Sequence, residues 1–592
     1  MPDEQHPAAR SESSAEGRPD GKRDRSARGK ERQGKERTSK ASRPTDSRPL
    51  DSQPTDSRPT AQRLKTLARP LGGVLAGVVL VAAGGGLVAA TALAPRTPGS
   101  SPRPAPQAAV PAGNLVAVCP APARLLQATP VGTDPQFSPE SATAKSAVSA
   151  LVLGNASGVL PGSRLAGLTG GPLVELAKAP AVPATASPAP APATTPPAPR
   201  AAVAQRGIDA VSVLSADAFG DQQPSAAAAM SYAADDGDLR GTAAAACQNP
   251  ANDLWLVGAD TSLGRTAVLN LSNASGTPAT VNLDLFGAKG VIQAPGSRGL
   301  LVAPGTTRSI VLAGLAPGQD SLAVRVRSTG GPVAAVIQQS VLRGLTPGGV
   351  DFITPGTGPA TRQAVTGLDI QDPAALGPLT AKSGFEDAGP ALQIAVPGAA
   401  DAVVEVKMYG RDGQKPLPGG GVVTAKAGSV TTVPLAGVPA GHYTVSASSD
   451  VSFTAAARVT RGLKAEDPTD AAWAPSAIRL GSQHLVPVPA AGSRFLMFGA
   501  PDGRATISYT PVTADGKIRS ATTADIAGGT TASVQIPANV EGSAVVGYLV
   551  SAAGEAAYGA VLLERDGKAD VATVPVSPGA AGQEKVAVTL GY

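Results

Sequence analysis

Apolar and polar residues alternate in two matching stretches of the chain. In VNLDLFGAKG, residues 281–290, every second position up to Leu285 is apolar, and VEVKMYGRDG, residues 404–413, repeats the pattern at an offset of 123. A period of two indicates a strand with one buried and one solvated face. The glycines that follow permit a tight turn. The sequence therefore predicts the same β-hairpin twice.

The similarity extends to both sides of these hairpins. The same offset aligns residues 267–273 with 390–396, and residues 312–318 with 435–441. Further short apolar runs follow at roughly ten-residue spacing, which is typical of antiparallel sandwiches of about 100 residues. We interpret the two stretches as copies of one domain.

A third, weaker copy occupies the C-terminal part of the chain. Gly-Thr-Thr at residues 529–531 and Gly542 match Gly-Thr-Thr at 305–307 and Gly318, at a common offset of 224. We therefore expect an all-β chain of tandem antiparallel, immunoglobulin-like β-sandwiches, which follow a disordered tail and one transmembrane helix. The three expected sandwiches are residues 251–350, 380–465 and 475–592.

Residues 112–250 are expected to form a less regular first β unit. Its short apolar runs are separated by Gly and Pro, as strands and turns are. Within it, residues 179–200 are a low-complexity insertion of Pro and Ala, which we expect to be a surface loop or a linker between lobes.

A long apolar segment, residues 71–94, carries no charged residue. A helix of this length just exceeds the ~30 Å hydrocarbon core of a bilayer, so a single membrane crossing is expected. A buried core helix and a cleaved signal peptide remain the alternatives. Gly73 and Gly77 form a GxxxG spacing, through which two such helices could dimerise.

The charge around this segment predicts its orientation. Residues 1–70 carry 17 Lys and Arg against 11 Asp and Glu, whereas few basic residues follow the segment closely. By the positive-inside rule, the N-terminus is cytoplasmic and the bulk of the chain is extracytoplasmic. The basic tail, residues 1–70, has few apolar residues and is expected to be disordered. Residues 95–111 are rich in Pro and Ala and are predicted to form a spacer between the membrane segment and the first β unit.

The remaining residues are almost neutral, because the tail accounts for the positive net charge of the chain. The exported part therefore has no electrostatic support for binding nucleic acid. The membrane is one expected partner, and an envelope protein or a glycan is another.

The two cysteines of the chain, Cys119 and Cys247, flank the first β unit. An even number of cysteines in an exported chain favours a disulfide. Two free buried thiols are the alternative. A metal site is disfavoured because no CxxC occurs and no histidine lies near either cysteine in the sequence.

Catalytic motifs are scarce in this sequence. GxSxG, SxxK, GxxxxGK[ST] and HExxH are absent, and the chain has only three histidines, His6, His442 and His484. We predict no catalytic residue, metal site or cofactor. Paired carboxylates leave little trace in a sequence, so a carboxylate-based hydrolase remains a minor alternative.

Two further groups of residues are candidates for binding. Asp235, Asp236 and Asp238 could hold calcium, but a turn with solvated charges is preferred because no EF-hand spacing accompanies them. Trp255 and Trp473 could each present a ring to a glycan, but core packing is preferred.

The stretch that starts at Cys247 resembles an uncharacterised actinobacterial family of large, exported, membrane-anchored proteins. Its sequence is CQNPANDLWLVGADTSLGRTAVLNLSNASGTPATVNLDLFGAKG. The resemblance covers the chain from about Cys119 to its end. The resemblance implies a gene that often lies near a glycosyltransferase gene. No catalytic residues are established for that family, so none is carried over to this chain. We therefore expect a non-catalytic structural or interaction module of the cell envelope. The alternative is an accessory or glycan-binding partner of an envelope glycosyltransferase.

Overall fold

The computed structural model describes residues 107–109, 113–126, 140–155, 158–180, 199–218, 223–490, 492–579 and 585–587. The predicted tail (1–70), the predicted transmembrane helix (71–94) with Gly73 and Gly77, and most of the Pro/Ala insertion lie outside these residues. Among the described residues, none belongs to a helix that is both long and apolar enough to cross a bilayer.

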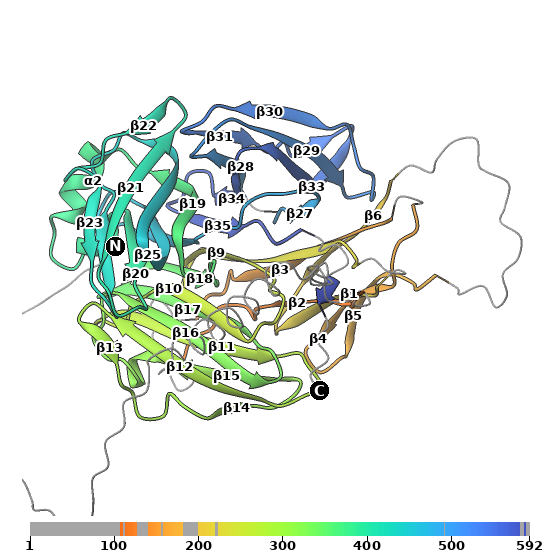
Figure 1. Cartoon of the computed structure of the whole chain (residues 1–592), viewed down its shortest axis with the longest axis horizontal. Coiled ribbons are helices and arrows are strands. Elements are labelled where there is room, and N and C mark those ends of the chain that lie inside the picture. Colours follow the sequence, from red (N-terminus) through yellow and green to blue (C-terminus); the bar gives the residue numbers. More distant parts are fainter. Residues whose placement is uncertain are drawn as a thin grey trace, which may run out of the picture. The chain divides into compact units, whose positions relative to one another are not determined.

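The described residues are mostly β-strand, as expected, and the strands form antiparallel sheets that pair face to face (Figure 1). The first sandwich has one sheet in the order β2-β7-β4-β5 and a second in the order β6-β3-β8-β9. The bounds are β2 Leu115–Cys119, β3 Lys145–Leu153, β4 Ser163–Gly167, β5 Pro172–Ala177, β6 Ala201–Gly207, β7 Ser212–Ala216, β8 Ala226–Ala234 and β9 Gly241–Ala246.

The second sandwich has sheets in the orders β10-β16-β12-β13, with β14 also on β12, and β15-β11-β17-β18. A short 3₁₀ turn, η2, follows β15. The bounds are β10 Asp253–Ala259, β11 Arg265–Asn273, β12 Ala279–Gly287, β13 Gly290–Ile292, β14 Leu300–Val302, β15 Thr306–Val311, η2 Leu312–Gly314, β16 Leu322–Gly330, β17 Ala334–Arg343 and β18 Thr346–Ile353.

In the third sandwich, the two sheets share one long strand, β25. Its first half pairs with β19 and β21, and its second half with β20 and β26. The bounds are β19 Ala360–Ile370, α2 Pro373–Thr380, η3 Glu386–Ala388, β20 Ala391–Ala395, β21 Ala402–Gly410, β22 Gly413–Lys415, β23 Val422–Ala425, β24 Val430–Pro434, β25 Gly441–Arg461 and β26 Asp470–Pro475.

The fourth sandwich has sheets in the orders β27-β33-β29-β30, with β32 on β33, and β31-β28-β34-β35. The bounds are β27 His484–Pro487, β28 Ser493–Ala500, β29 Ala505–Thr513, β30 Thr522–Ile526, β31 Thr530–Gln535, β32 Asn539–Val540, β33 Ser543–Gly554, β34 Tyr558–Glu564 and β35 Val571–Pro575. Separately, β1 (Gln107–Ala109), which lies within the expected spacer, pairs with β36 (Lys585–Ala587).

All four sandwiches share one strand order. When the short extra strands are left out and β25 is counted twice, the two sheets run 1-6-3-4 and 5-2-7-8 in each sandwich. The first unit, expected to be less regular, therefore has the same topology as the others. The third sandwich begins at Ala360 rather than near residue 380, because β19 supplies its first strand.

The predicted hairpins match in backbone conformation. Gly290 and Gly413 both have positive φ, 127° and 106°, and close the same turn against Gly287 and Gly410. The weaker match also holds, since Gly305 and Gly529 have φ of 66° and 73° directly before β15 and β31. Glycine is favoured at such positions because it has no Cβ.

The four sandwiches close on one another in a cycle. The last strand of each, β9, β18, β26 and β35, contacts the last strand of the next, and β35 contacts β9. Each core also takes residues from the following sandwich: Phe352 enters the first core, Trp473 the second, Leu562 the third and Ala244 the fourth. In Figure 1, β9, β18 and β35 lie where the sandwiches meet.

Candidate functional site

The four last strands meet at one buried carboxylate. Asp470, the first residue of β26, is 1% exposed. It accepts backbone N–H hydrogen bonds from Thr242 at 2.9 Å, Val350 at 3.2 Å, Ala471 at 3.0 Å and Val571 at 3.2 Å. Each sandwich thus contributes one donor to the same side chain. We call this point the axial carboxylate.

Two glycines leave room for this side chain. A Cβ on Gly241 would lie 2.8 Å from Asp470 Oδ1, and one on Gly349 would lie 2.4 Å from it. Both distances are shorter than van der Waals contact allows, so the approach of β9 and β18 to the axis depends on glycine at these positions.

A second buried carboxylate lies beside the first. Asp570 is fully buried and pairs with Arg240 at 3.1 Å and with Arg565 at 2.9 Å. Burial raises the pKa of Asp470 well above its ordinary value, and the nearby Asp570 raises it further, while the backbone donors oppose the shift. The axis therefore takes up a proton more readily than exposed carboxylates do.

Asp351 on β18 adds a pH-dependent contact to this region. Its Oδ2 accepts a hydrogen bond from the backbone N–H of Trp473 at 2.6 Å, and burial raises the pKa of Asp351 to about 7. Because this folded-state value exceeds the ordinary value of 3.8, the folded chain holds the proton between about pH 4 and pH 7, where the unfolded chain releases it. Stability should therefore fall as pH rises through this window, by up to about 4 kcal/mol from Asp351.

The substitution Asp351→Asn tests this linkage, because it removes the titration and keeps the acceptor for Trp473. Urea unfolding between pH 4.5 and pH 8 should show a weaker loss of stability with rising pH than in the wild type. The exposed Asp525→Asn should leave the wild-type slope unchanged. Identical slopes in all three proteins would contradict the linkage.

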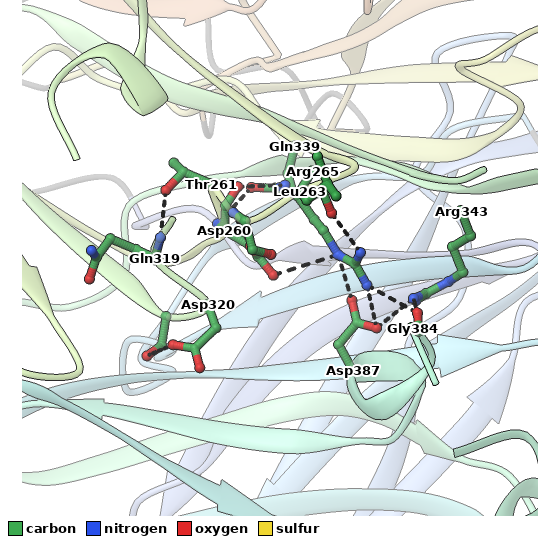
Figure 2. Close-up of polar contacts among 12 residues, drawn as sticks. Asp260, Thr261, Leu263, Arg265, Gln319, Asp320, Gln339, Arg343, Gly384 and Asp387 are labelled. Atoms are coloured by element: carbon green, nitrogen blue, oxygen red, sulfur yellow. Dashed lines mark hydrogen bonds and ion pairs between the residues drawn. The ribbon is translucent and has the colours of Figure 1, made fainter. Parts of the chain in front are cut away.

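A charged cluster joins the second and third sandwiches (Figure 2). Arg265 of β11 and Arg343 of β17 both reach Asp387 of η3, at 2.8 and 2.6 Å, and Asp260 lies 3.9 Å from Arg265. Although burial acts to raise it, the pKa of Asp387 lies below its ordinary value because Arg343 and Arg265 bind the carboxylate. The charges in this cluster are therefore mutually compensated, as expected of a structural contact.

A cavity of about 230 Å³ lies where residues of all four sandwiches meet. The segments that connect one sandwich to the next form part of its lining. The last residues of β9 and β35 line it, together with residues 354–357 and 476–478. All its lining residues are uncharged. The cavity therefore suits a neutral ligand better than an ion.

The predicted cysteines are brought together by the fold. Cys119 at the end of β2 and Cys247 directly after β9 form a disulfide, with their Cα atoms 4.2 Å apart. The bond ties the first strand of the first sandwich to its last, which lies in the opposite sheet.

The other candidate residues have structural partners. Asp235 pairs with Arg565 and Lys568, and Asp236 accepts hydrogen bonds from Ser141 and Thr143, as a turn with compensated charges would. The tryptophans Trp255 and Trp473 are 4% and 5% exposed and belong to a core. His484 is also buried; its ring bonds Gly481 N–H and the Ser577 carbonyl.

Sequence reasoning did not find the axial carboxylate. Asp470 lies in EDPTDAAW, which has the composition of a polar turn. Three of its four donors come from β9, β18 and β35, which are distant in sequence. Glycine at the start of β9 and in β18 was the one signal available, and it has meaning only once the strands are known to meet.

The fold and the axis together define a class: a large all-β protein in which four sandwiches of one topology close around a buried polar junction. The chain belongs to a family of unknown function, DUF5719, which it matches over residues 202–537. The match begins in β6 of the first sandwich and ends after β31 of the fourth. Comparisons with curated proteins and with solved structures gave no match.

Proposed function

We propose that this protein is a non-catalytic module of the cell envelope, anchored in the membrane by residues 71–94 with its four sandwiches outside the cytoplasm. The Cys119–Cys247 disulfide is the observation that carries the proposal. Disulfides persist in oxidising compartments and are rare in the cytosol. The basic residues before the apolar segment support the same orientation.

A structural or interaction role is supported by how the polar groups are used. The carboxylates at the axis and in the cluster of Figure 2 bind backbone N–H groups and arginines of neighbouring sandwiches. Such contacts hold the four sandwiches in one fixed arrangement. A surface whose parts are fixed relative to one another is suited to binding a partner.

The second candidate is an accessory role beside an envelope glycosyltransferase. It is favoured by the resemblance to an exported actinobacterial family and by the uncharged cavity of about 230 Å³, which has room for a sugar ring. Purification of the intact protein from detergent-solubilised membranes separates the two. A co-purifying glycosyltransferase or bound glycan would favour the accessory role, and a structural envelope partner would favour the first.

Site-specific labelling tests the proposed orientation. Both cysteines of the chain take part in the disulfide, so the native protein has no free thiol. Ser14→Cys in the tail and Lys289→Cys in the exposed β12–β13 turn therefore each supply a single thiol for labelling. A membrane-impermeant maleimide applied to intact cells should label Lys289→Cys and spare Ser14→Cys until the membrane is opened. The reverse pattern would refute the orientation.

A further inference from the structure

A histidine and two carboxylates converge where the third sandwich meets the fourth. They are Asp369 of β19, His442 of β25 and Glu564 of β34. One ligand atom from each lies within 4.8 Å of the other two. His442 Nε2 is 3.7 Å from Asp369 Oδ1 and 3.9 Å from Glu564 Oε1.

The imidazole of His442 is held as metal-binding imidazoles are. Its Nδ1 bonds Ser533 Oγ at 2.8 Å, and its ring meets the Phe495 ring edge-on at 5.0 Å between centroids. A neutral ring that donates from Nδ1 presents the Nε2 lone pair to the two carboxylates. Metal-ligating histidines are oriented by such a bond from the other ring nitrogen.

With the His442 ring neutral, the two carboxylates of the cluster share one arginine. Arg461 Nη2 lies 2.7 Å from Asp369 Oδ2 and also pairs with Glu564, so one cation faces two carboxylates. Asp369 Oδ2 is buried, and its contact is the ion pair with Arg461. The site therefore favours additional positive charge.

We propose that Asp369, His442 and Glu564 bind a divalent transition metal ion such as Zn²⁺, which links the third sandwich to the fourth. One imidazole nitrogen and two carboxylate oxygens are ligands that Zn²⁺ accepts. In a tetrahedral zinc site, ligand atoms lie about 3.3 Å apart. The separations from His442 Nε2, 3.7 and 3.9 Å, exceed this by about half an ångström, within the reach of side-chain rotation.

The guanidinium of Arg461 has space to leave the carboxylates. Arg461 lines an open cavity of about 470 Å³, together with Gly462, Lys464 and Lys568. The metal would take its place between Asp369 and Glu564, while the arginine turns towards this cavity. Arg461 is therefore the competitor of the metal rather than a ligand.

Zinc binding by the full-length chain in detergent tests the proposal. The protein is stripped with chelator, incubated with Zn²⁺ alone and freed of excess. The wild type should retain one zinc ion that His442→Gln does not, with affinity reduced about a hundredfold or more in the variant. Zinc should also raise the melting temperature of the wild type. Glu541→Gln, an exposed carboxylate in the fourth sandwich, should behave as the wild type does.

Arg461→Gln distinguishes a metal site from a structural ion pair. If Arg461 competes with the metal, its removal should tighten zinc binding about tenfold or more, because a positive charge near the site is lost. If the cluster is only an ion pair, the variant should lose stability and zinc should restore none of it. If His442→Gln does not fold, Asp369→Asn replaces it in the comparison. Equal zinc retention in the wild type and these variants, or none in the wild type, would overturn the proposal.

Discussion

Replacing the axial carboxylate, Asp470→Ala, should destabilise the chain by about 4 kcal/mol. The substitution leaves the backbone N–H groups of Thr242, Val350 and Val571 buried without their acceptor. Since these donors belong to three different sandwiches, the loss should weaken the contacts among all four. Urea unfolding at pH 6, followed by tryptophan fluorescence, measures the effect because Trp473 lies on the same strand as Asp470.

The matched control for this experiment is Asp525→Ala, whose side chain is 55% exposed. Loss of an exposed ion pair should cost about 0–1 kcal/mol. Equal effects of the two substitutions would show that the axial hydrogen bonds contribute no more than a surface contact does.

Removing the disulfide should have a comparable effect. The bond joins residues separated by 128 positions, and closing a loop of this length stabilises by about 4–5 kcal/mol in the chain-entropy model. The double variant Cys119→Ser and Cys247→Ser should therefore unfold at lower urea concentration.

Reduction of the wild type supplies the control for that variant. Dithiothreitol should shift the wild-type transition towards that of the double variant and leave the variant unchanged. A variant as stable as the oxidised wild type would contradict a stabilising role for the bond.

The parts of the fold that could be predicted were those that depend on local sequence patterns. The alternation in residues 281–285 and 404–408 reports a buried face directly, and the glycines after it report the turn. Matching these stretches predicted two copies of one sandwich, and Gly305 and Gly529 extended the match to the last sandwich. The even number of cysteines predicted the disulfide for a chemical reason, namely the oxidising compartment that an exported chain is expected to enter.

What could not be predicted depends on contacts between distant elements. The first sandwich lacks the VNLDLF pattern and carries the Pro/Ala insertion. Its similarity to the other sandwiches therefore lies in strand order and not in sequence. The cycle arises because the last strand of each sandwich packs on that of the next. Asp369, His442 and Glu564 likewise lie on three separate strands of two sandwiches, and no sequence spacing relates them.

The central claim, an exported module with a closed first sandwich, is tested most directly by the state of its cysteines in living cells. Free thiols are alkylated as the cells are lysed, and the protein is digested and mapped by mass spectrometry without reduction. The account predicts one linked pair of peptides, Cys119 to Cys247. Recovery of both cysteines as alkylated free thiols would contradict the bond, and with it the extracytoplasmic location.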